Sequence, residues 1–106
     1  GHSLSIRVLP ILLILSKLTE QLGILLEERG EDGEATQKYL RALEVEPVAE
    51  VMCRRVMMTY VRLGRRSEAI GVYQRFSQAL HTKLDLSPTP ETVSLYHDIT
   101  KPASST

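Results

Sequence analysis

The sequence repeats itself at a spacing of 34 residues, and this period constrains the fold more than any other feature. When the chain is shifted against itself by 34 positions, Leu26, Gly30, Glu34, Ala35 and Tyr39 fall on Tyr60, Gly64, Glu68, Ala69 and Tyr73. The small residues suit places where helices turn or approach closely, and the bulky ones lie at helix-packing spacing. The 106 residues therefore hold two similar units and little else.

The second unit has the pattern of a helical hairpin. Cys53, Val56, Met57 and Tyr60 follow the spacing i, i+3, i+4, i+7, which predicts an apolar stripe on a helix over 48–63. Gly64 suits the left-handed position after the helix end, and Ser67 is a candidate N-cap for the next helix. The apolar face of that next helix contains Ala69, Ile70, Tyr73, Phe76 and Leu80. A link of about three residues makes the two helices antiparallel.

The first unit and the C-terminal segment are also predicted to be helical. Residues Leu15, Leu18, Leu22, Ile24, Leu25 and Leu26 form a stripe on one helix, which residues 30–33 end, and a second helix over 34–45 buries Ala35, Tyr39, Ala42 and Leu43. After the helix breaker at 87–90, Thr89 can cap and Pro90 can open a closing helix that extends to residue 101. Such a helix covers the end of the stack.

The sequence thus predicts an all-α fold, a right-handed tetratricopeptide-like stack of two antiparallel helical hairpins plus a C-terminal closing helix, with five helices and no strand. We expect one domain over 4–101, with the first repeat at about 16–47, the second at about 50–86 and the closing helix at about 90–101. Residues 1–3 are typical of a cleaved expression tag, and 102–106 are expected to be a flexible tail. The predicted repeat-packing residues are Leu26, Gly30, Ala35, Tyr39, Tyr60, Gly64, Ala69 and Tyr73.

The charges cancel overall but not locally. The chain has 13 basic and 13 acidic side chains, which argues against a free-standing nucleic-acid binder. Residues 31–50 hold six acids and two bases, whereas 51–83 hold seven bases and one acid. One hypothesis makes Arg54, Arg55, Arg62, Arg65 and Arg66 a patch for a polyanion or a partner. The other, which we favour, pairs the acidic and basic helical faces within the stack.

Chemistry-bearing residues form no recognisable constellation. Cys53 lies in phase with Met57 on one helix face, which indicates core packing rather than a metal or redox site. We therefore expect no enzyme activity, no cofactor and no metal. One cysteine indicates a reducing compartment, and the longest apolar run is too short to cross a bilayer, so we expect a cytoplasmic protein without membrane contact.

The segments 69–76 and 80–96 carry a resemblance. Ala69-Ile-Gly-Val-Tyr73-Gln-Arg-Phe76, followed by Leu84-Asp-Leu-Ser-Pro88-Thr-Pro-Glu91-Thr and Leu95-Tyr96, is similar to the bacterial transcriptional activator domain, the tetratricopeptide-like module of large bacterial regulators that include the antibiotic regulatory proteins. Asp85 stands where this family often has Gly, and Thr89 where it often has Ser. The resemblance covers roughly residues 34–99.

The resemblance implies a protein-interaction and oligomerisation module that acts beside a separate DNA-binding domain. Its partners would be a second copy, other domains of the same regulator or RNA polymerase, and this fragment itself is not expected to bind nucleic acid. The alternative function is a generic tetratricopeptide adaptor that binds a peptide or helix and is unrelated to transcription. In that case Tyr39 or Tyr73 would line a groove rather than be buried, although burial is the outcome we expect.

The N-terminal helix is predicted to be apolar nearly all round, because residues 11–15 are consecutive aliphatic residues. One hairpin can cover only one side of such a helix. We therefore expect self-association through residues 8–22, with Ile11, Leu12, Ile14 and Leu15 as its contacts. Pro10 predicts that the helix either starts near Leu9 or kinks there.

Overall fold

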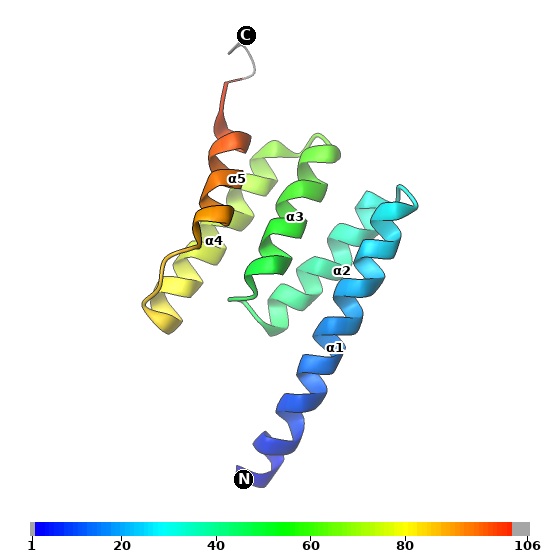
Figure 1. Cartoon of the computed structure of the whole chain (residues 1–106), viewed down its shortest axis with the longest axis vertical. Coiled ribbons are helices and arrows are strands. Elements are labelled where there is room, and N and C mark those ends of the chain that lie inside the picture. Colours follow the sequence, from blue (N-terminus) through cyan, green and yellow to red (C-terminus); the bar gives the residue numbers. More distant parts are fainter. Residues whose placement is uncertain (1, 103–106) are drawn as a thin grey trace.

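The computed structural model describes residues 2–102, except for the side chains of residues 2–7 and 9, and the described chain consists of five helices (Figure 1). They are α1 (His2–Glu28), α2 (Asp32–Val45), α3 (Glu50–Arg62), α4 (Arg66–Leu84) and α5 (Pro90–Thr100). Within residues 2–102 there is no strand, so the predicted all-α class and the number of helices are confirmed. Most of the expected tail, residues 103–106, lies outside the described residues, as does Gly1.

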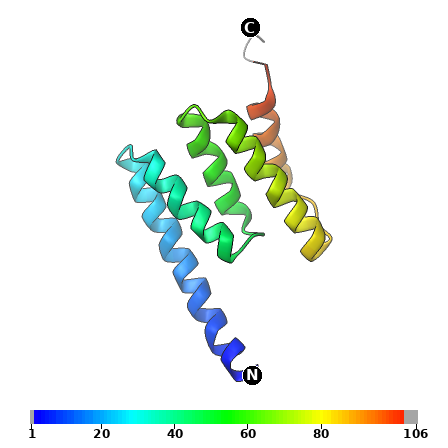
Figure 2. The same cartoon turned by 180° about the vertical axis from the view of Figure 1, so that it is seen from behind.

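The helices form two layers, consistent with a tetratricopeptide-like stack. Helices α1 and α2 form one antiparallel hairpin and α3 and α4 the next, and α5 packs on α3 and α4. Figures 1 and 2 show α1, α3 and α5 on one side of the molecule, with α2 and α4 on the other. The N-terminal part of α1 extends well past the end of α2 (Figure 1).

The repeated glycines close the first helix of each hairpin in the same way. Gly30 and Gly64 have φ angles of 77° and 76°, a left-handed conformation that favours glycine. The N–H of Glu31 donates to the carbonyl of Leu26 at 2.8 Å, and the N–H of Arg65 donates to the carbonyl of Tyr60 at 2.7 Å. Both turns are Schellman caps. The cap explains why Leu26 and Gly30 recur 34 residues later as a pair.

Three predicted helix ends differ from the structure. Helix α1 begins at His2 and continues through Pro10, which removes only one backbone hydrogen bond, so of the two alternatives at Pro10 the start near Leu9 is not observed and the kink stays a prediction. Gly33 lies in the first turn of α2 rather than in the terminator, and Ser67 lies inside α4, whose N-cap is Arg65 without a side-chain cap bond.

The third left-handed residue is Asp85, with a φ angle of 53°, at the C-terminal end of α4. Its position explains why glycine suits this place in the resembled family. Thr89 is the N-cap of α5 and Pro90 its first residue, as predicted. The Thr89 hydroxyl nevertheless does not cap its own helix, because it donates to Glu50.

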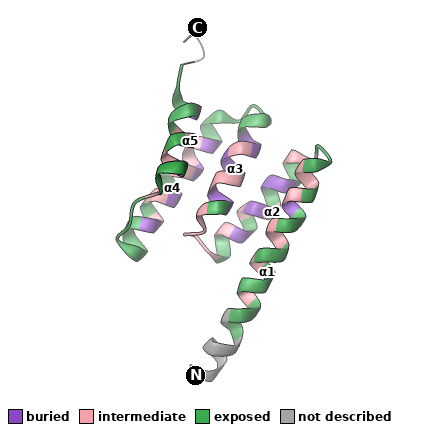
Figure 3. Cartoon of the chain, viewed as in Figure 1, coloured by how far each residue is buried: buried purple, intermediate pink, exposed green. Residues whose placement is uncertain are grey.

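The core runs along the surface where the two hairpins meet (Figure 3). The predicted stripe of Cys53, Val56, Met57 and Tyr60 is buried, and so are the matching alanines Ala35 and Ala69. Two buried threonines join α2 to α3, since the Thr36 hydroxyl donates to Thr59 Oγ1 at 2.6 Å. The hydroxyl groups of these two buried threonines therefore have hydrogen-bond partners.

The two repeated tyrosines have different environments. Tyr39 is fully buried against Gly23 of α1, and its hydroxyl donates to the carboxylate of Glu27. Burial raises the pKa of Tyr39 first, and the hydrogen bond to Glu27 raises it further. Tyr73 is half-buried and stacks on Tyr96 of α5, with ring centroids 4.0 Å apart and planes 13° apart. Neither tyrosine is fully exposed.

Gly23→Ala tests the contact between α1 and Tyr39. A Cβ at position 23 would overlap the Tyr39 ring, so we expect the free energy of unfolding to fall by about 1–3 kcal/mol in urea denaturation, in spite of the better helix propensity of alanine. Gly33→Ala is the matched control, because its Cβ would meet nothing within 4 Å and the helix should gain up to about 1 kcal/mol. Equal losses in the two variants would contradict this packing.

Candidate protein-interaction surfaces

Helix α1 presents a row of exposed aliphatic side chains. We call Val8, Ile11, Leu15, Leu18, Leu22 and Leu25 the α1 face; these side chains are 42–57% exposed. Of the four predicted self-association residues, Ile11, Ile14 and Leu15 are exposed, whereas Leu12 is half-buried. Leu12 lies with Val45 of α2 at a small pocket between the two helices. The exposed row extends further toward the C-terminus than the predicted contacts.

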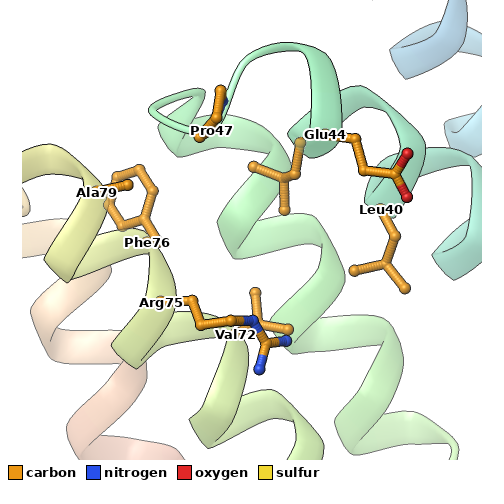
Figure 4. A pocket seen from close by; sticks show the side chains of 8 residues that line it. Leu40, Glu44, Pro47, Val72, Arg75, Phe76 and Ala79 are labelled. Carbon is orange, nitrogen blue, oxygen red and sulfur yellow. The ribbon is translucent and has the colours of Figure 1, made fainter. Parts of the chain in front are cut away.

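A second surface is the groove between α2 and α4, of about 380 Å³ (Figure 4). Its apolar lining includes Leu40, Pro47, Val72 and Phe76, and the side chains of Glu44 and Arg75 also line it; the remaining lining residues are Leu43 and Ala79. The groove therefore combines an apolar floor with one acid and one base. Tyr39 and Tyr73 are not among these lining residues.

Two of the predicted patch arginines point toward the first hairpin. Arg55 Nη1 lies 3.4 Å from Glu27 Oε2, and Arg62 pairs with Glu27 as well as with Asp32, whose Oδ2 lies 3.1 Å from Arg62 Nε. The hydrogen bond to Asp32 is the main cause that raises the pKa of Arg62. The carboxylate of Glu27 is only 12% exposed and also accepts the Tyr39 hydroxyl, so it joins α1, α2 and α3.

The other three arginines have different partners. Arg54 donates to the hydroxyl of buried Thr92 at 2.9 Å, and Arg66 donates to the main-chain carbonyls of Ile99 and Lys101. Arg65 makes an exposed pair with Glu68 at 3.8 Å. The structure thus gives the five arginines partners in the first hairpin, in α5 and in their own turn, while Arg62 and Arg66 also line one surface pocket together with Lys101.

The carboxylate of Glu50 holds α5 against the start of α3. Glu50 Oε2 accepts the backbone N–H and the hydroxyl of Thr89, at 2.7 and 2.6 Å, and the hydroxyl of Thr92 at 2.6 Å. Burial by itself would raise the pKa of Glu50, but these hydrogen bonds and Arg54 outweigh it and lower the pKa. Sequence reasoning missed Glu50 and Glu27, because the hydroxyl groups that donate to them lie 12–42 positions away and no local pattern marks such contacts.

The described residues show little that could support metal chemistry. Among the side chains that the structure describes, no three His, Cys, Asp or Glu residues are grouped to hold an ion, and no helix of the described residues is long and apolar enough to span a bilayer. Cys53 is buried, and its thiol lies 3.8 Å from the Met57 sulfur. Burial raises the pKa of Cys53 to about 12, so this cysteine stays a thiol at neutral pH.

Glu50→Gln is expected to lower the free energy of unfolding by about 1–2 kcal/mol at pH 7. Because the folded state lowers the pKa of Glu50, this stabilisation is present above the ordinary value of 4.5 and is lost as the pH falls through the folded value. Urea denaturation at pH 7 and pH 3 should therefore show a difference between wild type and variant that shrinks in acid. In the control Glu91→Gln, the altered side chain is 74% exposed, and we expect a negligible effect at both pH values. A pH-independent difference for Glu50→Gln would refute the assignment.

Sequence comparison places this architecture in a family. A family model for the bacterial transcriptional activator domain matches residues 13–100, which include most of α1, both hairpins and the closing helix. No curated protein and no solved structure matches the chain. The match extends further toward the N-terminus than the resemblance read from residues 34–99. The chain therefore belongs to the bacterial transcriptional activator domain family, a module associated with transcriptional regulators.

Proposed function

We propose that this chain is a protein-interaction and oligomerisation module of a bacterial transcriptional regulator, and that it acts beside a separate DNA-binding domain. Family membership over residues 13–100 supplies the transcriptional context. The α1 face is the observation that carries the interaction role, since six neighbouring aliphatic side chains are exposed along one helix. Exposed apolar surface of this extent is typical of a docking site. In this role the chain works in the cytoplasm as a binding module, without catalysis or a cofactor.

The environment of the arginines supports a protein partner rather than DNA. Arg55 and Arg62 are paired with acids of the first hairpin, and Arg54 and Arg66 are bonded to α5. A phosphate contact would have to replace these intramolecular partners. We therefore expect the isolated chain to leave random duplex DNA unretarded in a gel at 50 mM salt, where electrostatic binding is strong. Retardation at micromolar protein would count against this part of the proposal.

A second candidate function is a tetratricopeptide adaptor that binds a peptide or helix, and the groove between α2 and α4 favours it. Its apolar floor could accept aliphatic side chains, and Glu44 and Arg75 could pair with charges beside them. The two candidates use different surfaces. Substitutions on the α1 face and in the groove therefore distinguish them.

A tethering experiment tests the proposed function. The chain is fused to an unrelated bacterial DNA-binding domain whose operator lies upstream of a weak promoter, and reporter output is compared with that of the DNA-binding domain alone. We expect the fusion to raise output several-fold and Leu18→Lys to remove most of the increase, since a lysine disrupts the apolar α1 face without touching the core. Reporter output equal to that of the DNA-binding domain alone would refute the proposal.

A lysine in the groove provides the comparison with Leu18→Lys. We choose Ala79→Lys, because Val72 is buried and a lysine there would disturb the core. Ala79 lines the groove and is half-buried. Loss of reporter output in Ala79→Lys but not in Leu18→Lys would show that the groove, rather than the α1 face, binds the partner. The fusions should be present at equal levels by immunoblot, because a difference in abundance would imitate a loss of function.

A further inference from the structure

The α1 face follows the spacing of a two-helix seam. Its members lie at positions 8, 11, 15, 18, 22 and 25, so the intervals alternate three and four residues without interruption. This alternation is the heptad pattern, with Val8, Leu15 and Leu22 at a positions and Ile11, Leu18 and Leu25 at d positions. Such a row favours another helix that lies alongside it with the same repeat.

Helix α1 packs on its own hairpin with a different set of residues. Gly23 is buried against Tyr39 of α2, Leu26 lies against the core, and Glu27 joins α2 and α3. At 100° per residue Gly23 and Glu27 lie about 100–180° from Leu18, Leu22 and Leu25, whereas Leu26 lies about 40° from Leu22, at the edge of the seam. The seam is therefore presented by a helix that its own hairpin already supports, and a partner could reach it without displacing α2.

The part of α1 around Val8 and Ile11 has little cover from its own hairpin. Figure 1 shows this part of α1 extending past α2, and Val8 and Ile11 are 42% and 56% exposed. A helical segment that lacks tertiary contacts is marginally stable in water. An occupant of the seam would therefore stabilise this segment as well as cover its apolar side chains.

The seam is complementary to a reversed copy of itself. If two α1 helices run antiparallel about a two-fold axis between positions 16 and 17, Val8 meets Leu25 of the second copy, Ile11 meets Leu22, and Leu15 meets Leu18. Each layer then joins an a position to a d position, and all six side chains are used. The reversed copy also places the extending first turns beside the supported half of the other α1.

The residue types at the a and d positions favour an antiparallel pair of α1 helices over a parallel pair. Parallel dimers prefer β-branched residues at a and leucine at d. Two of the three a positions here are leucine, and one of the three d positions is isoleucine. In the antiparallel arrangement no layer contains two β-branched residues.

We propose that the occupant of the α1 face is a second copy of this chain, and that the two α1 helices pair antiparallel to form a two-fold dimer. This inference rests on the proposed function and names its partner. Two observations support the dimer: the exposed residues have heptad spacing, and the row is complementary to a reversed copy of itself.

Sedimentation of the whole chain tests the dimer. We expect wild type to be dimeric at tens of micromolar, and Leu18→Lys to weaken the dimer by about 100-fold or more, because two lysines would then lie next to the centre of the seam. Leu13→Lys is the matched control: Leu13 is 61% exposed but lies nearly opposite the seam, so the variant should remain a dimer. Circular dichroism should show both variants folded, since both sites are exposed.

A monomeric wild type at 100 µM, or equal effects of Leu13→Lys and Leu18→Lys, would overturn the dimer. Either result would remove self-association from the proposed function but leave its protein-interaction role intact if the tethered chain still raised reporter output, because another protein would then be the partner of the α1 face. Loss of reporter output together with an intact dimer would instead leave this inference standing and refute the proposed function.

The direction of pairing is tested with a spin label attached through Glu28→Cys. Antiparallel helices related about position 16.5 place the two labels about 35 Å apart along the axis, whereas parallel helices place them about 10 Å apart. Cys53 is buried and should not react, which wild type exposed to the same label verifies. A short distance would overturn the antiparallel arrangement.

Discussion

The carboxylate of Glu27 is the interaction on which the stack depends. It is nearly buried at the end of α1, accepts the hydroxyl of Tyr39, and faces the guanidinium groups of Arg55 and Arg62. One acid thus joins α1 to α2 and the first hairpin to the second. A buried carboxylate is costly unless charge and hydrogen bonds compensate it, and here two arginines and a tyrosine supply both. Glu50 acts similarly at the junction with α5.

The acidic segment 31–50 and the basic segment 51–83 are in contact where the two hairpins meet. Arg62 of the second hairpin pairs there with Asp32 of the first. Arg55 and Arg62 are thereby paired with acids of the same chain. The exposed surface nevertheless includes many aliphatic side chains, and a row of them runs along α1.

The sequence was sufficient for the fold because the fold is set by local signals repeated at 34 residues. Gly30 and Gly64 mark the caps, and the stripe from Cys53 to Tyr60 marks the core face of α3. The set of α1 side chains that face outward was less predictable from the sequence. Helix α1 is apolar nearly all round, so periodicity alone did not say that Leu12 would face its own hairpin and Leu18 would face outward. That choice depends on Gly23, which lets the ring of Tyr39 approach the helix closely.

The central claim is that the exposed row on α1 is an interface that a second copy of the chain covers. Amide hydrogen exchange over residues 8–15, measured at 1 µM and at 200 µM protein, tests it most directly. These amides lie where α1 has least support from its own hairpin, so pairing should slow their exchange at the higher concentration, while the amides of 52–60 in the core stay unchanged. Exchange over residues 8–15 that is identical at the two concentrations would contradict the account.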